Sequence, residues 1–470
     1  MTRAEAGAIY ARGRRATVGA LLAQARQIAA LEARLAQTSQ TSSRPPSSDP
    51  SGMARPRREP SGRRPGGQPG HPGRTRALVP VAAVHAVIPV TPGRCGRCGR
   101  RLSGTDPTPV RHQVTEVPPL TPVITEYQLH TLVCRCGAPT RAALPLGVPA
   151  GAFGPRLQAL VAVCTGVYRL SRRTTVRLFA ECFGVDLALG SVTACERAAS
   201  QALAAPVAVA HAFVQQQPVA HVDETGWREA RRRAWLWVAV TSPVTVFLVH
   251  ARRGAVAART LLGSFAGILT SDRWTAYTRW PLRDRQLCWA HLRRHFAAFA
   301  EVAGPAGRLG EALLAETAQL FTWWHRVRDG TLARASFQTY VGPLRRRVEA
   351  LLWLGRRCRH APTAATCREI LALAPALWTF VRVSGVEPTN NAAERALRPG
   401  VLWRKGSFGS HSPAGSRFAE RMLTVAATLN QQRRNVVDYV TLACDAALRG
   451  EAAPSLLPAV GTRSTRRKAA

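Results

Sequence analysis

The feature that most constrains this fold is a long stretch, residues 38–76, that cannot bury a hydrophobic core. Ser, Pro, Gly and Arg dominate it, as residues 42–49 and 62–73 show. Such a composition favours disorder in the free chain. Its arginines make it a basic arm that could follow a phosphate backbone, although a solvated charged tether would have the same composition. The chain must therefore fold as separate parts on either side of this segment.

The charge of the chain points to a polyanionic partner. Lys and Arg number 65 against 27 Asp and Glu, which gives a formal net charge of +38 over 470 residues. A positive field of this size attracts nucleic acid, because neutralising phosphates drives non-specific binding. All the basic residues except Lys405 and Lys468 are Arg, so part of the excess can reflect a coding bias rather than selection.

Nothing in the hydropathy pattern indicates a membrane protein. The longest apolar runs, such as residues 234–240, are as short as strands, whereas a membrane span needs about 20 apolar residues. The N-terminal residues lack the apolar stretch of a signal peptide. The eleven Cys are scattered rather than arranged as a disulfide framework. We therefore expect a cytoplasmic protein in a reducing compartment.

A heptad pattern precedes the linker. Leu21, Ile28 and Leu35 repeat every seven residues within the predicted helix at residues 14–37. This spacing is typical of a short coiled coil, which would make the protein a homo-oligomer. An amphipathic helix packed on its own chain explains the pattern equally well.

Residues 155–205 predict three helices. The first covers residues 155–167 and the second residues 171–182, with Gly184 at the turn that follows. Ser191 can cap a third helix that runs to Ala205. This order is that of a helix-turn-helix, with the third helix reading DNA.

Short apolar strands alternate with helices after residue 218. The predicted strands are 219–222, 234–241, 244–250 and 267–270, with a helix at 255–262. Residues 301–385 and 391–448 are predicted to be helical. Four tryptophans of the first helical region are expected in its core: Trp323, Trp324, Trp353 and Trp378.

Two cysteine pairs lie in a segment with β-like alternation at residues 110–117 and 123–133. One is the CxxC pair Cys95 and Cys98, and the other is the tighter pair Cys134 and Cys136. Four thiolates complete a tetrahedral zinc site, and a small segment gains stability from such an ion. A redox CxxC is the alternative, but no thioredoxin-like pattern surrounds it.

Three acidic residues suggest a metal-dependent active site. Asp223 and Asp272 each follow an apolar strand, and Glu394 begins a predicted helix. Carboxylates converging on one place repel each other unless divalent cations lie between them, and Mg²⁺ prefers such oxygen ligands. Two ions held in this way can promote displacement at a phosphate.

Each acid also has a structural explanation. Asp223 could be a turn residue, with its neighbour Glu224 as the ligand instead. Asp272 could cap a helix or pair with Arg273. Glu394 could form a capping box with Asn391.

Two further groups of residues accompany the third acid: a Cys and a His that precede it in the sequence, and basic residues close to it. Cys288 and His291 form a C-x-x-H element without a second pair nearby, so we expect a structural contact behind the site rather than zinc. Basic residues near Glu394 suit a DNA groove, although a solvated helix face is the alternative. The predicted DNA-binding residues are Arg395, Arg398, Arg404, Lys405 and Arg417.

Over nearly its full length the chain resembles the insertion sequence 66 family of bacterial transposases. The resemblance rests on motifs in the family's order, besides the heptads and the cysteine pairs. They are Ser-Arg-Pro-Pro-Ser-Ser-Asp at 43–49, Gly-Gly-Gln-Pro-Gly-His-Pro-Gly at 66–73, Val-Asp-Glu-Thr-Gly-Trp at 222–227, Ser-Asp-Arg-Trp at 271–274, Cys-Trp-Ala-His at 288–291, Thr-Asn-Asn-Ala-Ala-Glu-Arg at 389–395 and Arg-Met-Leu-Thr-Val at 421–425.

This resemblance implies the function and the roles of the acids. It implies a DNA transposase that binds the ends of an insertion element and cleaves and joins DNA. Asp223, Asp272 and Glu394 would bind Mg²⁺ or Mn²⁺ in a ribonuclease-H-like core, and a zinc module and a helix-turn-helix would precede that core. Companion proteins of the element are plausible partners, beside terminal-repeat and target DNA in the bacterial nucleoid. A non-catalytic DNA-binding regulator and a nuclease without joining activity remain alternatives.

Together these observations predict a multidomain α+β protein. The expected parts are a coiled-coil helix (1–37), a disordered basic linker (38–79), a zinc-finger-like module (80–148), a helix-turn-helix region (149–210), a catalytic core (211–430) with a helical insertion (301–385), and a C-terminal helix with a basic tail (431–470).

Overall fold

The fold is taken from a computed structural model that describes residues 2–35 and 76–458. Most of the predicted linker and the basic tail lie outside these residues. The chain divides into two compact units, residues 50–121 and the remainder of the chain, which are described separately.

The predicted N-terminal helix is confirmed. Helix α2 covers Arg14–Leu35, and a shorter helix, α1 (Arg3–Ala11), precedes it. Thr2 and Glu5 form a reciprocal capping box at the start of α1. Leu21 and Ile28 are more than half exposed, so an apolar strip on α2 is available for pairing, and the coiled coil stays a prediction.

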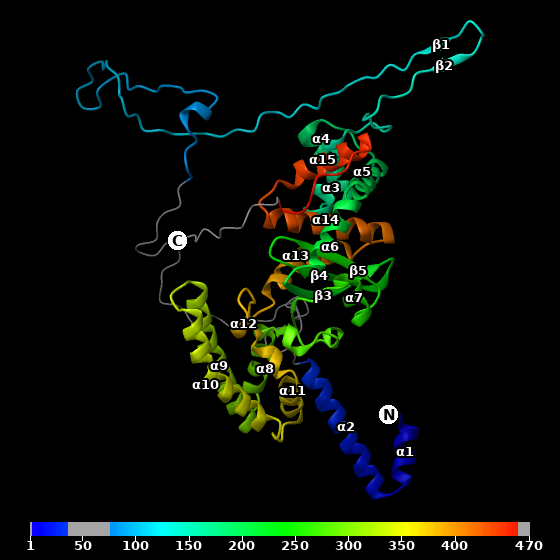
Figure 1. The fold of residues 1–470 in the computed structure, drawn as a ribbon, viewed down its shortest axis with the longest axis vertical. Helices are drawn as coiled ribbons and strands as arrows, with labels where there is room; N and C mark the ends of the chain where they lie inside the picture. Colours follow the sequence, from blue (N-terminus) through cyan, green and yellow to red (C-terminus); the bar gives the residue numbers. More distant parts are fainter. Residues whose placement is uncertain (1, 36–75, 459–470) are drawn as a thin grey trace. The chain divides into compact units, whose positions relative to one another are not determined.

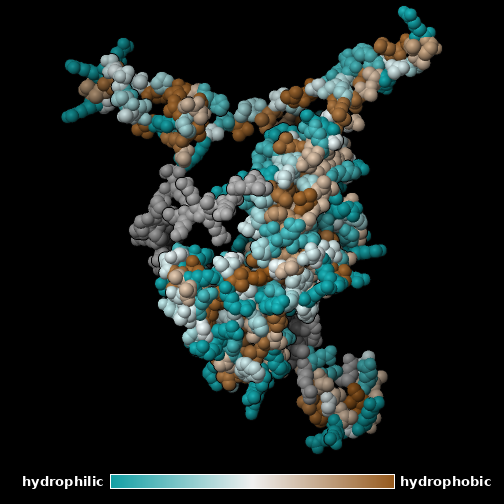
Figure 2. Space-filling view, viewed as in Figure 1, coloured by the Kyte–Doolittle hydropathy of each residue, from teal (hydrophilic) through white to brown (hydrophobic). Residues whose placement is uncertain are grey.

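The segment with the cysteine pairs contains little regular structure. It has one turn of 3₁₀ helix (Val81–Ala83) and a hairpin of β1 (Thr131–Val133) and β2 (Pro139–Arg141). The strand expected at residues 110–117 is wrong, and only the end of the one at 123–133 forms. Val110 is 99% exposed, and Figure 2 shows brown hydrophobic residues along this part. Alternation alone therefore does not make a strand where no partner strand is described.

Four helices follow residue 154: α3 (Pro155–Gly166), α4 (Arg172–Phe183), α5 (Leu189–Ala202) and α6 (Ala204–Gln215). The first two confirm the predicted helices, and Gly184 ends α4 in the left-handed conformation that glycine favours. The expected cap at Ser191 is wrong, because α5 already begins at Leu189.

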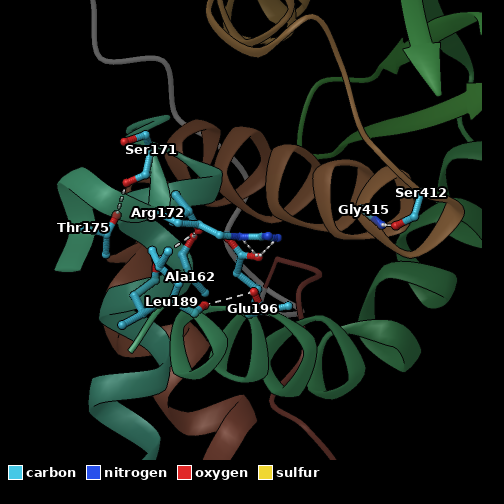
Figure 3. A network of polar contacts seen from close by, with 11 residues as sticks. Ala162, Ser171, Arg172, Thr175, Leu189, Glu196, Ser412 and Gly415 are labelled. Carbon is cyan, nitrogen blue, oxygen red and sulfur yellow. Dashed lines mark hydrogen bonds and ion pairs between the residues drawn. The ribbon is translucent and has the colours of Figure 1, made fainter. Parts of the chain in front are cut away.

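An ion pair connects α4 to α5. Figure 3 shows the Arg172 guanidinium next to the Glu196 carboxylate, and the two groups lie 2.6 Å apart. In the same view the side chain of Thr175 reaches back to Ser171, the residue that caps α4. One face of α5 is buried against α3, α14 and α15, and the opposite face, which includes Arg197, is exposed.

A five-stranded mixed sheet forms the centre of the larger unit. Its strands are β3 (Val219–Glu229), β4 (Arg232–Val240), β5 (Thr245–His250), β6 (Ile268–Ser271) and β7 (Arg285–Leu287). Their order is β5-β4-β3-β6-β7. The pairs among β3, β4 and β5 are antiparallel, whereas β6 and β7 run parallel to β3. Helix α7 (Ala255–Leu262) lies between β5 and β6 in the sequence, as predicted.

Both faces of this sheet are covered by helices (Figure 1). Three helices close the chain: α13 (Asn391–Ser407), α14 (Pro413–Gln431) and α15 (Val436–Arg449). On β4, Leu236 and Val238 share a core with α13 and α14, while Trp237 and Ala239 face the core that includes α6 and α7. The alternation of side chains along a strand thus gives the sheet two different faces.

Helix α14 covers the edge strand β5 with polar side chains. The N–H groups of Thr245, Phe247 and Val249 donate to three side chains of α14, those of Thr428, Thr424 and Glu420 respectively, at 2.6–3.1 Å. Every second residue of the strand matches every fourth residue of the helix, because both steps advance about 6 Å. An edge that could pair with another chain is therefore closed.

A helical insertion separates β7 from α13 and has its own core. It contains α8 (Trp289–Ala300), α9 (Pro305–Arg328), α10 (Arg334–Gly355), α11 (Ala361–Ala372) and α12 (Thr379–Arg382). Trp324 and Trp378 are buried as expected and Trp323 is partly buried, but Trp353 is 51% exposed and stacks against Arg356 instead. Among the described helices, none is long and apolar enough to cross a membrane.

Candidate active site

The register of two parallel strands brings Asp223 and Asp272 together. His221 of β3 pairs with Thr270 of β6. Continuing this register by two residues places Asp223 beside Asp272, which directly follows the end of β6. The Asp272 carboxylate accepts the N–H of Trp274 at 2.8 Å, which fixes its direction at the strand end. Sequence spacing alone cannot show such a register.

The pleat of β3 separates Asp223 from its neighbour Glu224. Asp223 pairs with Val238, a residue of the core shared with α13, whereas Glu224 pairs with Trp237 on the other face. Glu224 is 9% exposed and its carboxylate binds the Arg253 guanidinium at 2.9 Å and the Tyr277 hydroxyl at 2.7 Å. Its oxygens are thus already engaged, which favours Asp223 as the ligand.

Helix α13 carries Glu394 in its first turn, and hydrogen bonds tie the start of this helix to the sheet. The Asn390 amide donates to the Val222 carbonyl at 2.7 Å, and the Asn390 N–H donates to the Cys288 sulfur at 3.1 Å. The capping box with Asn391, the structural alternative for Glu394, is absent, since Asn390 precedes the helix and makes no side-chain cap.

The acids influence one another strongly. Burial raises the pKa of Asp223 well above its usual value, and the carboxylates of Glu224, Asp272 and Glu394 raise that pKa further. One oxygen of Glu394 is buried without a hydrogen-bond partner among the described residues. Mutual repulsion among carboxylates and a buried carboxylate oxygen without a hydrogen bond are the features that a divalent cation would relieve.

Cys288 and His291 lie against the third acid. Single ligand atoms of Cys288, His291 and Glu394 all lie within 4.8 Å of one another. The Glu394 carboxylate is 3.7 Å from both the His291 ring and the Arg294 guanidinium. Burial lowers the pKa of His291, so a neutral ring faces the acid near pH 7.

Sequence reasoning missed two buried residues of this region. Arg285 of β7 is 1% exposed and its guanidinium lies 3.3 Å from the Asp272 carbonyl. Asn390, fully buried, links β3 to α13. An Arg and a Gln in a three-residue strand resemble a loop in the sequence, and Asn390 is predicted only as part of the motif at 389–395, without a role of its own.

The five predicted DNA-binding residues have different environments. Arg395, Arg398, Lys405 and Arg417 are exposed. Arg404, in contrast, is half-buried and donates to the Gly226 carbonyl at 2.8 Å. We therefore assign Arg404 a structural contact with β3, which a count of basic residues cannot distinguish from a phosphate contact.

The cysteine pairs form two similar turns in different units of the chain. The Gly99 N–H donates to the Cys95 carbonyl, and the Gly137 N–H donates to the Cys134 carbonyl. Hydrogen bonds from the neighbouring backbone and from the second cysteine lower the pKa of Cys95 and of Cys134. Such turns suit thiolate ligands of a metal, and the zinc site stays a prediction.

The sheet and its acids define the class of this protein, a mixed α/β protein with carboxylates at adjacent parallel strands. Residues 150–418 match the family described as Transposase IS66 family, and since this is more than half of the chain, the chain belongs to that family. Residues 3–77 match a second family, described as of unknown function. The uncharacterized protein y4qI of Sinorhizobium fredii is 28% identical over 229 residues, which are 44% of this chain and 42% of that relative. The similarity thus spans less than half of the relative.

Proposed function

We propose that this chain is a DNA transposase that binds the ends of an insertion element and catalyses DNA cleavage and strand transfer. The observation that carries the proposal is the β3–β6 register, which aligns Asp223 with Asp272. Helix α13 adds Glu394 from the face on which Asp223 lies. The strand order, with three antiparallel strands followed by two parallel ones, supports a ribonuclease-H-like core.

Asp223, Asp272 and Glu394 would hold divalent ions, Mg²⁺ or Mn²⁺. When bound, these ions would stabilise the negative charge that develops on the attacking and leaving oxygens at a phosphate. The buried Glu394 oxygen, which has no hydrogen bond among the described residues, and the mutual repulsion of the acids support this assignment.

The residues of the chain supply position and charge. Water cleaves a phosphodiester at the element end and leaves a 3′-hydroxyl. This hydroxyl then attacks a phosphodiester of target DNA, so that one new bond forms as one breaks. Arg395 and Arg398, exposed next to Glu394, hold the phosphates of the strand that reacts. The hydrogen bonds of Asn390 keep Glu394 fixed against the sheet.

Other parts of the chain would serve assembly and recognition. Helices α3, α4 and α5 follow the predicted order of a helix-turn-helix, with exposed arginines on α4 (Arg173 and Arg177) and on α5 (Arg197). The apolar strip of α2 would pair two copies, and Cys95, Cys98, Cys134 and Cys136 would bind a structural zinc ion.

The test is a strand-transfer assay with labelled element-end DNA, a plasmid target and Mg²⁺ or Mn²⁺. Asp223→Asn, Asp272→Asn and Glu394→Gln should each lose joined products at least about 1000-fold while DNA binding persists, because each removes a charge but little volume. Asp329→Asn, at an exposed acid of the insertion, is the matched control and should retain activity.

The alternatives predict different products. Cleavage without joining would support a nuclease. Tight DNA binding with no chemistry under either metal would support a non-catalytic regulator. Full activity in any of the three variants would show that the substituted acid is not part of the active site.

A further inference from the structure

A rigid loop beside the sheet presents an aromatic side chain to solvent. Phe408 follows α13, has a positive φ of 61° and is 74% exposed. A bulky residue in this conformation is uncommon and must be held by its surroundings. Phe408 therefore combines an exposed phenyl ring with a constrained backbone, which suits a contact with a ligand.

The loop is held by the tip of the β3–β4 hairpin. The Ser410 backbone N–H donates to the Arg228 carbonyl at 2.9 Å, and the Ser410 carbonyl accepts the Ala230 N–H at 3.0 Å. Gly409 has φ 117°, and a Cβ there would lie 2.2 Å from the Arg228 carbonyl oxygen, so only glycine fits. We call the hairpin tip (228–233), together with the last residues of α13 and the loop that follows it (405–411), the hairpin clamp.

The hairpin clamp carries a concentrated positive charge. Its exposed cations make no ion pair with any carboxylate in the described part of the chain, and its one acid is the half-buried Glu229. These cations are Arg228, Arg231, Arg232, Arg233 and Lys405, with Arg417 close by on α14. A phosphate backbone is the partner whose charge fits such a surface.

Helix α13 links the hairpin clamp to the candidate active site. Arg395, Arg398 and Lys405 are exposed along the helix between Glu394 and Phe408. Phe408 lies fourteen residues after Glu394, which corresponds to about 21 Å along the helix at 1.5 Å per residue. A DNA duplex lying along α13 would thus have about six base pairs between the reacting phosphodiester and Phe408.

We propose that Phe408 stacks on an unstacked nucleobase of the bound DNA while the arginines of the hairpin clamp hold the flanking phosphates. This inference rests on the proposed function, because it takes DNA as the ligand. Aromatic stacking tolerates any base, and combined with a basic groove it is the usual way to hold an unpaired nucleotide. The rigid loop lowers the entropic cost of ordering the ring.

The test measures binding of the full chain to two 30-base-pair duplexes, one fully paired and one with a single bulged 2-aminopurine. Wild type should bind the bulged duplex about 10-fold more tightly and change the 2-aminopurine fluorescence on binding. Phe408→Ala should lose both effects and keep its affinity for the paired duplex. Phe408→Trp should retain both, and Leu354→Ala, at an exposed leucine of the insertion, should behave as wild type.

A second variant tests the phosphate contacts. Replacing Arg231, Arg232 and Arg233 together by Gln should weaken binding to both duplexes and lower the slope of log affinity against log salt by about 2 to 3.

An unchanged preference for the bulged duplex in Phe408→Ala would overturn the proposal. So would a changed oligomeric state in that variant with unaltered DNA binding, since Phe408 would then contact protein. Both assays measure DNA binding and do not depend on catalysis. If the strand-transfer assay showed that the three acids are not required, the proposed chemistry would be wrong, but the binding results for Phe408 would still stand.

Discussion

Two arginines of α13 show how the environment decides the role of a residue. Arg404 donates to the β3 backbone at Gly226, and burial lowers the pKa of its guanidinium. Arg398, six residues earlier on the same helix, is exposed. The same side chain thus supports the fold in one position and is free to contact phosphate in the other.

We expect Arg404→Ala to lower the free energy of unfolding by about 1–3 kcal/mol, because a backbone carbonyl loses its charged donor. Arg398→Ala should leave stability unchanged and reduce the salt dependence of DNA binding by about one unit of slope. Urea unfolding and salt-dependent anisotropy measure the two effects. The reverse pattern would assign the DNA contact to Arg404.

Glu420 should make stability depend on pH. Burial raises its pKa to about 7 from an ordinary value of 4.5, although its carboxylate accepts the Val249 N–H. Between these values the folded protein binds a proton that the unfolded chain has lost. The stabilisation is therefore complete below the unfolded pKa and is lost as the pH rises through the folded pKa.

Glu420→Gln keeps an oxygen that can accept the Val249 N–H but removes the ionisable carboxyl group. The free energy of unfolding of the variant should therefore not fall as the pH rises through the folded pKa of Glu420. Urea unfolding at pH 5, 6, 7 and 8 should show wild type losing stability relative to the variant between pH 5 and 8. Parallel profiles would show that Glu420 keeps an ordinary pKa in the folded protein.

At the scale of elements, the contact between α14 and β5 closes one edge of the sheet. Thr424→Val preserves shape but removes the hydroxyl that accepts the buried Phe247 N–H. We expect a loss of about 1–3 kcal/mol in the free energy of unfolding, because the donor remains without a partner. The control Thr260→Val removes only a bond from an exposed threonine to its own helix, and denaturation should show it near neutral. Equal losses in the two variants would argue against this role.

At the scale of the whole molecule, the cysteine pairs should bind metal. Purified protein should contain about one zinc ion per chain, measured by mass spectrometry of the metal, since four thiolates complete a tetrahedral site. Cys95→Ser and Cys134→Ser should each lose it, whereas Cys182→Ser, at an exposed cysteine of α4, should not. Zinc retained in both pair variants would exclude this site.

Much of the local structure was predictable from the sequence. The helix at 255–262 matches α7, and apolar runs located four strands of the central sheet within a few residues, apart from the longer end of β3. Periodicity and caps act between near neighbours, so the sequence carries them directly. Strand β7 was missed because a buried Arg and Gln resemble a loop.

The sequence by itself determined most helices and four strands of the central sheet, the positive charge and the order of the motifs. Only the tertiary structure decided which acids meet, since the β3–β6 register and the pleat favour Asp223 over Glu224. Tertiary packing also made Arg404 structural and left Trp353 exposed. The physical reason is that pairing and burial depend on residues far apart in the chain, which no local pattern contains.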